Sequence, residues 1–237
     1  MTGIELGLAA LIIGIGALVQ GSIGFGMNIV AAPLLVLIDT ALVPGPTLAA
    51  AVVLTLLITV REHEHIEFSG LGWALAGRVP GTVLGALALL VLSTKGLTVL
   101  FAVLVLGAVA LSTGWHIPRN ASTLFAAGGL SGFMSMTTSI GGPPMALVYQ
   151  RASGSTLRAT LSGYFLVGGV ISVIGLAAVG RFGRDELVAS AVLLPGLVIG
   201  FGLSRFTGHL LDRAWLRPTV LVVAATSAVI ALIQALW

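Results

Sequence analysis

Two glycine-rich stretches contain the residues of this sequence best suited to binding a ligand. They are Gly21-Ser22-Ile23-Gly24-Phe25-Gly26 and Ser139-Ile140-Gly141-Gly142-Pro143-Pro144. Glycine adopts backbone angles that other residues avoid, and it lets a ligand approach the backbone closely. A helix that begins just after such a break points its free N–H groups and its positive dipole end at that place. Two such helix ends meeting from opposite faces would form an anion site without a metal.

Polar and aromatic side chains lie next to both stretches and complete the candidate site. Thr137 flanks the second stretch, and Phe25 and Tyr149 could form an apolar wall. The alternative is that these glycines only allow close helix packing, as small residues do in membranes. We prefer that alternative for isolated glycines such as Gly107 and Gly175. The candidate binding residues are Gln20, Ser22, Gly24, Phe25, Gly26, Asn28, Arg78, Thr138, Ser139, Gly141, Gly142, Pro143 and Tyr149.

Arg78 is the one basic residue that falls deep inside an apolar segment, away from either end. The segment is expected to begin near residue 69, which places Arg78 about 14 Å along it, close to half of a hydrocarbon core about 30 Å thick. A charge at that depth is costly and marks a functional site by default, and a single cation suits a monoanion. If the segment begins later, Arg78 could instead reach the interface with its long side chain.

The acidic residues, in contrast, all lie in predicted loops or at segment ends. Carriers coupled to protons or cations often place an acid within the membrane, and none is available here. Coupling through a buried carboxylate is therefore disfavoured, although backbone carbonyls could still hold a sodium ion. The eight acids are Glu5, Asp39, Glu62, Glu64, Glu67, Asp185, Glu186 and Asp212.

The composition requires that these candidates lie within a membrane. Of the 237 residues, 57% are hydrophobic and 8% are charged, and the mean hydropathy is +1.13. A soluble domain carries about 25% charged residues, so a soluble enzyme, a nucleic-acid binder and a disordered chain are excluded. The net charge of +3 comes from scattered bases, not from a phosphate-binding cluster. The absence of cysteine excludes disulfides and thiolate metal sites.

The fold class that follows is all-α, a polytopic integral membrane protein with about eight transmembrane helices in a single domain, 1–237. A crossing takes roughly 20 apolar residues, so 26–38 and 143–150 are too short to cross as full helices. A cleaved signal peptide is not expected, because no basic region precedes the first segment. The segments run over 4–20, 26–38, 46–60, 69–92, 97–114, 122–137, 143–150, 156–179, 187–206 and 214–236.

An internal repeat is visible at two places. The motif Val79-Pro80-Gly81-Thr82-Val83-Leu84-Gly85 resembles Leu194-Pro195-Gly196-Leu197-Val198-Ile199-Gly200, 115 positions later, with four of seven residues identical. Ser22-Ile23-Gly24 recurs as Ser139-Ile140-Gly141 at an offset of 117. We therefore expect homologous repeats at about 4–114 and 122–236. Paired interrupted segments in two halves point to a transporter's binding site.

The basic residues indicate that the two repeats are inverted. If each broken stretch is a hairpin, seven bases lie on one side and three on the other, whereas a single crossing at each break leaves no clear bias. The positive-inside rule favours the hairpin arrangement, with both termini outside. The seven are Arg61, Arg119, Arg151, Arg158, Arg205, Arg213 and Arg217, and the three are Lys95, Arg181 and Arg184.

Two other motifs have weaker claims to chemistry. Residues 61–67 contain two histidines, but their spacing of two places them on different helix faces, so a hydrated loop is expected rather than a metal site. Gly129-Leu130-Ser131-Gly132 fits the G-x-S-G pattern of intramembrane serine proteases. That chemistry needs a partner histidine at matching depth, and His209 falls in a predicted loop. No catalytic residue, metal or cofactor is expected.

The paired motifs resemble those of a known family. Gly21 to Gly26 with Pro33-Leu34-Leu35, and Ser139 to Pro144 with Tyr149 and Arg158-Ala159-Thr160, are similar to the two halves of the TauE/SafE family, the sulfite exporter or toluene-sulfonate uptake permeases. The resemblance covers nearly the whole chain. Phe25 departs from the family pattern, which often has glycine there, and this bears on substrate identity.

The resemblance implies a multi-pass carrier of the bacterial inner membrane that moves sulfite, sulfoacetate or another organosulfonate. Its partners would be a small anionic substrate and the lipid bilayer, without nucleic acid, and a homodimer is one assembly left open. The substrate would bind at the membrane midplane between the two breaks, and alternating access would follow from rocking of the two halves. The alternatives are a passive anion channel and an intramembrane serine protease with Ser131 as nucleophile.

Overall fold

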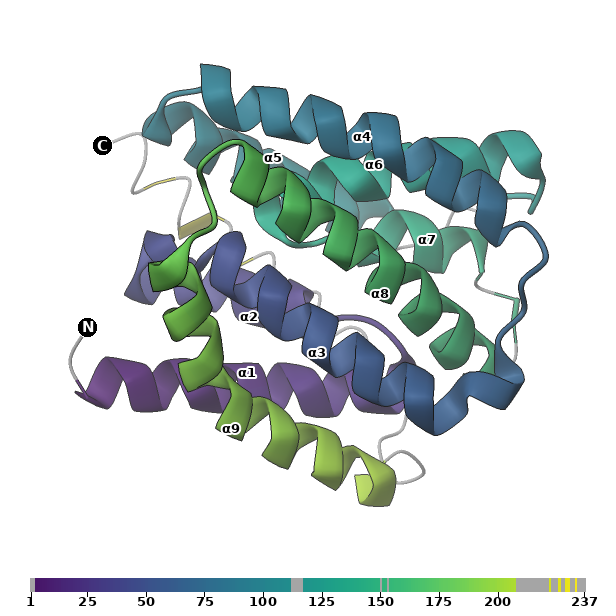
Figure 1. Cartoon of the computed structure of the whole chain (residues 1–237), viewed down its shortest axis with the longest axis horizontal. Helices are drawn as coiled ribbons and strands as arrows, with labels where there is room; N and C mark the ends of the chain where they lie inside the picture. The colour runs from purple at the N-terminus through teal and green to yellow at the C-terminus, as the bar shows by residue number, and fades with distance from the viewer. Residues whose placement is uncertain are drawn as a thin grey trace.

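The computed structural model describes residues 3–111, 117–149, 151–152 and 154–207, together with a few single positions near the C-terminus. Within these residues the chain is helical throughout, as the composition predicts, and the helices form one bundle (Figure 1). The α-helices are α1 (Gly3–Ile23), α2 (Met27–Ile38), α3 (Gly45–Glu62), α4 (Leu71–Val91), α5 (Thr94–Leu111), α6 (Ala121–Thr138), α7 (Gly142–Val148), α8 (Gly154–Ala178) and α9 (Arg184–Thr207). Short 3-10 turns, Thr40–Leu42 and His63–His65, lie on either side of α3. The segment predicted at 214–236 falls almost wholly outside the described residues.

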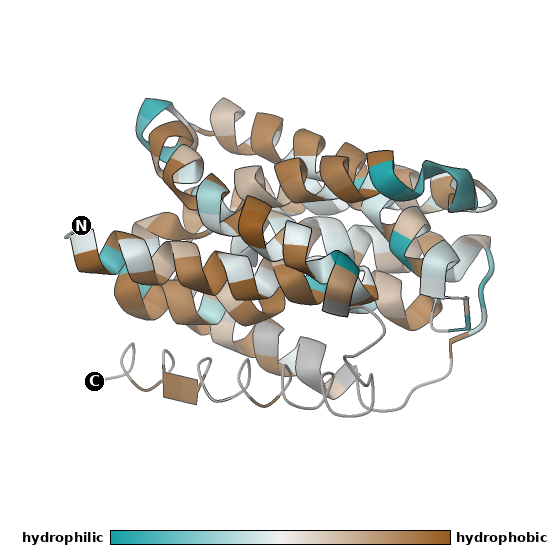
Figure 2. Cartoon of the chain, turned by 90° about the horizontal axis from the view of Figure 1, so that it is seen from below, coloured by the Kyte–Doolittle hydropathy of each residue, from teal (hydrophilic) through white to brown (hydrophobic). Residues whose placement is uncertain are grey.

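The helices have the length and apolar surface that a bilayer requires. Five helices of the described part are long and apolar enough to cross a membrane, and they correspond to α1, α3, α4, α8 and α9. Helices α5 and α6 have 18 residues each, a length of about 27 Å. Brown, hydrophobic residues run along the helices in Figure 2, and many large apolar side chains are exposed on their outer faces. The prediction of a polytopic all-α membrane protein is confirmed.

The two glycine-rich stretches break the chain, but over fewer residues than their sequences indicate. Helix α1 continues through Ser22 to Ile23, so the first break is Gly24-Phe25-Gly26, where both glycines have positive φ. Helix α6 continues to Thr138, so the second break is Ser139-Ile140-Gly141. Helices α2 and α7 are 12 and 7 residues long, and both are too short to span a bilayer alone.

Helix α2 returns along α1, the helix that precedes it. Met27 packs on Gly16 of α1, and Ala31 and Leu35 share one core cluster with Ile13 and Ala9 of α1. As the chain proceeds along α2, its contacts therefore move backwards along α1. The first broken stretch is an antiparallel hairpin, which is the arrangement that the distribution of basic residues favoured.

Two helix pairs form the closest contacts of the bundle, and both use the Pro-Gly motifs. Helix α4 packs along α6, where a Cβ at Gly81 would collide with the carbonyl of Gly129. Helix α9 packs along α1, where a Cβ at Gly200 would collide with the carbonyl of Gly14. Small residues let membrane helices approach in this way. If the two repeats correspond, α4 matches α9 and α6 matches α1, so the α4–α6 pair is the counterpart of the α1–α9 pair. This pairing supports the repeats, which remain a prediction.

Charged residues gather at the two ends of the bundle. Arg158 pairs with Glu62, Arg119 pairs with Glu67, and the backbone of Glu67 bonds the hydroxyl of Thr160, all at one end. At the other end Arg181 bonds the carbonyl of Leu89 near the end of α4. The described members of each predicted set of bases lie at the expected end. The positive-inside rule then predicts that the end with Arg61, Arg119, Arg151, Arg158 and Arg205 faces the cytoplasm; Arg213 and Arg217 lie outside the described residues.

Candidate functional site

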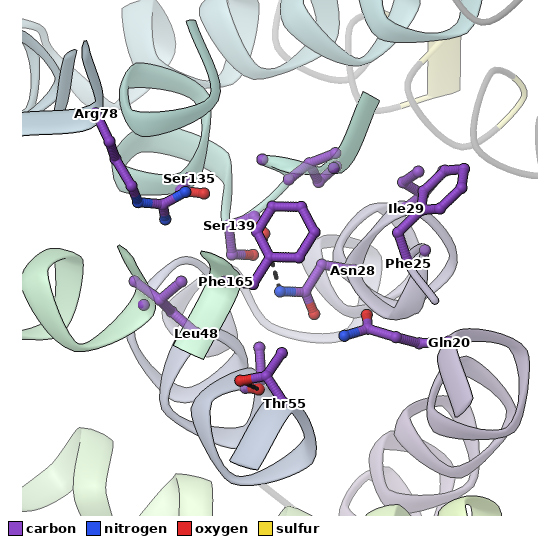
Figure 3. A pocket seen from close by; sticks show the side chains of 16 residues that line it. Gln20, Phe25, Asn28, Ile29, Leu48, Thr55, Arg78, Ser135, Ser139 and Phe165 are labelled. Atoms are coloured by element: carbon purple, nitrogen blue, oxygen red, sulfur yellow. Dashed lines mark hydrogen bonds between the residues drawn. The ribbon is translucent and has the colours of Figure 1, made fainter. Parts of the chain in front are cut away.

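A small cavity lies in the bundle between the two breaks. Its volume is about 40 Å³, enough for about three water molecules. Figure 3 shows Arg78 and Ser135 on one side of this central cavity and Gln20 and Phe25 on the other. The residues that line it are Gln20, Phe25, Gly26, Asn28, Ile29, Leu48, Ala51, Thr55, Arg78, Ser135, Ser139, Ile140, Gly141, Gly142, Phe165 and Gly169. The structure thus brings both predicted breaks and Arg78 to one place.

Two amide side chains, one on each side of the first break, line this cavity. Gln20 Oε1 accepts a hydrogen bond of 3.0 Å from the backbone N–H of Met27, the first residue of α2. Asn28 Nδ2 donates a bond of 2.9 Å to the backbone carbonyl of Ser139 in the second break (Figure 3). This bond fixes the amide orientation, and it leaves Asn28 Oδ1 buried without a partner. Asn28 therefore joins the two breaks directly.

Ser139 is the centre of the second break. Its φ of 58° is the left-handed conformation, which a non-glycine residue adopts only when its surroundings impose it. The Ser139 hydroxyl accepts a bond of 3.0 Å from Thr47 Oγ1 of α3 and donates one of 2.6 Å to the Thr138 carbonyl. Together with the bond from Asn28, these contacts hold the break against α2 and α3.

The two short helices differ in the donors that they offer. Helix α2 begins with residues that all carry a backbone N–H, although Gln20 uses that of Met27. Helix α7 begins Gly142-Pro143-Pro144, and proline has no N–H to donate. The two helix ends are therefore not equivalent anion-binding groups, because α7 lacks two of the donors that a helix N-terminus normally provides.

Among the described residues, Arg78 is the only cation that lines the central cavity, and it is 1% exposed. It lies seven residues after Leu71, about 10 Å along α4. Its Nη1 donates to Ser131 Oγ at 3.1 Å, its Nη2 to Ser172 Oγ at 3.4 Å, and its guanidinium lies 5.0 Å from the centre of the Tyr164 ring. The side chain is buried inside the bundle. The alternative from sequence, in which Arg78 extends to the membrane interface, does not fit this burial.

The charge of Arg78 has no counter-ion in the described part of the chain. The ion pairs found there join Arg61, Arg119 and Arg158 to glutamates at one end of the bundle. Arg78 Nε has no hydrogen-bond partner among the residues that the structure describes. A guanidinium has five N–H donors, and here two of them meet neutral hydroxyls. A buried charge without a partner is costly, and an anion in the adjoining cavity would remove that cost.

Five of the predicted binding residues do not line the central cavity. Thr138 donates its hydroxyl to the Met134 carbonyl within α6. Gly24 packs its backbone against Arg158. Ser22 and Tyr149 line two other cavities, both at the end of the bundle that carries Arg61, Arg119 and Arg158, which we call the arginine-rich end. Pro143 is buried in the first turn of α7. The roles of all the predicted residues in ligand binding remain predictions.

Tyr149 belongs to a cluster with Arg119 and Glu67. The Arg119 guanidinium stacks on the Tyr149 ring at 4.5 Å and makes two bonds of 2.8 Å to the Glu67 carboxylate. These bonds lower the pKa of Glu67 below its ordinary value, since Arg119 stabilises the ionised form. Tyr149 thus helps to hold the loop before α4 to the loop before α6.

The remaining cavity residues could not be identified from sequence. Thr55 of α3, Ser135 of α6 and Phe165 of α8 each lie in an ordinary helical run, without a break or a charge to mark them. Gly168 has a clearer role, because a Cβ there would overlap the Arg78 guanidinium. Only the packing of α8 against α4 reveals this relation.

The serine of the protease-like motif supports Arg78. Ser131 Oγ accepts the bond from Arg78 and donates one of 2.7 Å to the carbonyl of Gly141. His63 and His65 lie at the end of α3, and His116 and His209 fall outside the described residues. Ser131 therefore connects Arg78 to the second break. In the described part of the chain no group of acids and histidines could hold a metal.

Comparison with known proteins shows the family to which the chain belongs. The family model of the sulfite exporter TauE/SafE matches residues 8–231. The chain belongs to the TauE/SafE family. It is also 29% identical over 216 residues to a "Probable sulfite/organosulfonate exporter TauE" of Cupriavidus necator, which covers 84% of this chain and 82% of that protein. No solved structure matches the chain.

Membership in the TauE/SafE family confirms the resemblance found in the paired motifs. Together with the apolar helices, it identifies the chain as a multi-pass membrane transporter. The match spans both breaks and Arg78, so the central cavity lies within the region that defines the family.

Proposed function

We propose that this transporter carries a small oxyanion, sulfite or a small organosulfonate, and binds it in the central cavity. The observation that carries the proposal is Arg78, a fully buried guanidinium beside the cavity with no counter-ion among the described residues. The similarity to the Cupriavidus protein, a probable sulfite/organosulfonate exporter, supports a sulfur oxyanion.

The charge of the cavity favours a monoanion. Arg78 contributes one positive charge, and no acidic residue appears among the lining residues. A monoanion such as hydrogen sulfite or a sulfonate would neutralise that charge, whereas a dianion would leave one negative charge buried at considerable cost. The expected ligand is therefore singly charged when it is bound.

The size and polarity of the cavity favour a compact ligand. A volume of about 40 Å³ holds a sulfite-sized ion, whereas a larger sulfonate requires the helices to separate. The amide of Gln20 and the hydroxyl of Ser135 offer donors for the anion's oxygens, and Phe25 and Phe165 form apolar walls. Asn28 Oδ1, buried and unpaired, suits an O–H of the ligand, which hydrogen sulfite has and a simple alkanesulfonate lacks.

Transport would follow from movement of two helix groups around this cavity, each containing helices of both predicted repeats. The α1–α9 and α4–α6 pairs are held tightly by glycine contacts, so each pair is expected to move as a unit. The bonds of Asn28 in α2 and Thr47 in α3 to Ser139 join the first half of the chain to the second break. These bonds would have to break and reform as access alternates between the two sides of the membrane.

Counterflow in proteoliposomes tests this function and separates a carrier from a passive channel. Vesicles loaded with unlabelled sulfite should accumulate radioactive sulfite transiently, and accumulation should saturate with concentration. Arg78→Gln should abolish it. A non-saturating flux without counterflow would support a channel instead, and a response to carboxylates but not to sulfur oxyanions would overturn the proposed substrate class.

A further inference from the structure

A second polar cavity lies at the arginine-rich end of the bundle, next to the first break. Its volume is about 290 Å³, several times that of the central cavity. The lining contains three arginines and one glutamate, so it is strongly positive. The residues are Gly21, Ser22, Arg61, Glu62, Arg158, Ser204 and Arg205, and we call them the mouth site. Ser22 was predicted from sequence to bind substrate in the middle of the membrane, and the structure places it here instead.

One carboxylate holds two of the three arginines. Glu62 Oε1 accepts a bond of 2.9 Å from Arg61 Nη2, and both Glu62 oxygens accept bonds of 3.0 Å from Arg158 Nε. Arg205 is exposed and has no ion pair in the described part of the chain. The two oxygens of Glu62 therefore occupy the position between two guanidinium groups that an incoming oxyanion would prefer.

The same contacts close this end of the bundle. Arg61 Nη2 donates to the carbonyl of Gly21 near the end of α1 at 2.8 Å, and Arg61 Nη1 donates to Ser204 Oγ of α9 at 3.1 Å. The Arg61 guanidinium also lies 4.7 Å from the centre of the Phe201 ring. The ion pair between Arg158 and Glu62 joins α8 to α3. The Glu62 carboxylate thus links the four helices around the mouth site, α3 and α8 directly and α1 and α9 through Arg61.

The mouth site and the central cavity both lie close to the first break. Gly24 lies against the backbone of Arg158, with a Cβ there only 2.7 Å from Arg158 Cα, and Gly26 lines the central cavity. Thr55 lines the central cavity, and Arg61, six residues later on α3, lines the mouth site. Six residues span about 9 Å along the helix axis. The two cavities are therefore near neighbours along α3.

We propose that the mouth site is a second binding site for small oxyanions, and that Glu62 occupies it as a tethered competitor when no anion is bound. An oxyanion that binds between Arg61 and Arg158 displaces the Glu62 carboxylate and releases the links between α3, α8 and α1. The proposal rests on the proposed function only for the identity of the anion. A lipid phosphate offers the same chemistry, and the test separates the two sources.

Sulfite binding to purified protein, measured by calorimetry in lipid-free detergent, tests the mouth site in an Arg78→Gln background. That substitution removes the central site and leaves binding at the mouth as the remaining event. Glu62→Gln should then tighten sulfite binding about three- to tenfold, because the competitor is removed. Arg158→Gln should abolish the binding. Glu64→Gln is the matched control: it removes an equal charge from an exposed neighbour and should leave affinity within about twofold.

The outcomes distinguish anion binding at the mouth site from anion binding in the central cavity. Absence of sulfite binding in Arg78→Gln protein that remains monodisperse, or equal affinity in the Glu62→Gln and Glu64→Gln variants, would overturn the mouth site. If sulfite binding is lost when phosphatidylglycerol is added, the site belongs to a lipid headgroup and the proposal also fails. Unchanged stoichiometry between wild type and Arg78→Gln would instead contradict the central site and leave the mouth site standing.

Discussion

The guanidinium of Arg78 in α4 lies against Gly168 of α8, at a point where no other residue fits. A Cβ on Gly168 would overlap Nε, Cδ and Cζ of Arg78. The contact fixes the cation beside the central cavity, where Ser131, Ser172 and the Tyr164 ring hold its other sides. The geometry of the proposed anion site therefore depends on a glycine that touches no ligand.

Gly168→Ala should impair transport by moving Arg78. The added methyl group forces the guanidinium out of its position, so sulfite affinity should fall about tenfold or more, since one misplaced charged contact is worth at least about 1.4 kcal/mol. The matched control is Gly163→Ala in the same helix, where a Cβ would meet only Ile66 at an ordinary 3.7 Å. Equal sulfite affinity in the two variants would show that Arg78 is not held by this contact.

Asn28→Asp tests the sign of the charge that the cavity accepts. The substitution keeps the size of the side chain, adds a negative charge next to the proposed ligand and removes the donor to Ser139. Anion affinity should fall about 100-fold, because like charges within a small buried space repel strongly. The control is Asn120→Asp, the same change at the exposed N-cap of α6, where aspartate caps equally well. Asn28→Asp protein that binds as many sulfite ions as the wild type, each with unchanged affinity, would exclude binding at this cavity.

The Pro-Gly motif of α4 should stabilise the folded protein by letting α4 and α6 pack closely. A Cβ at Gly81 would collide with the carbonyl of Gly129, so Gly81→Ala should separate α4 from α6 and destabilise the protein by roughly 1–3 kcal/mol. Gly72→Ala, in the same helix, meets nothing within 4 Å and should leave the thermal midpoint unchanged. A midpoint for Gly81→Ala equal to that of Gly72→Ala would mean that the two helices are not packed as described.

Most of the fold was predictable because the bilayer constrains it. Each long segment had to be helical and apolar, and the glycine-rich stretches marked the two places where the helices are interrupted. The site was harder to predict. Arg78 stood out because a charge in an apolar run is rare, but Thr55 and Gly168 face the site only through the packing of α3 and α8. Ser22 lines the mouth site and not the central cavity, and it lies in α1 because that helix continues three residues beyond its predicted end at residue 20.

The Glu67–Arg119 pair should give the protein a measurable loss of stability in acid. Arg119 lowers the pKa of Glu67 below its ordinary value of 4.5, so the pair contributes stability above that value. The contribution is lost as the pH falls through the lowered pKa. Thermal midpoints measured from neutral to acidic pH should therefore fall more steeply in the wild type than in Glu67→Gln. Parallel curves would show that the pair does not contribute.

The role of Arg78 is tested by sulfite binding to purified wild-type protein compared with Arg78→Gln, with Arg78→Lys as the charge-conserving control. Arg78→Gln should remove one sulfite per protein molecule and abolish counterflow. Arg78→Lys should keep weaker binding, because a lysine supplies the charge without the planar donors. If Arg78→Gln binds the same number of sulfite ions with the same affinity as wild type and still transports them, the buried cation is not the anion site.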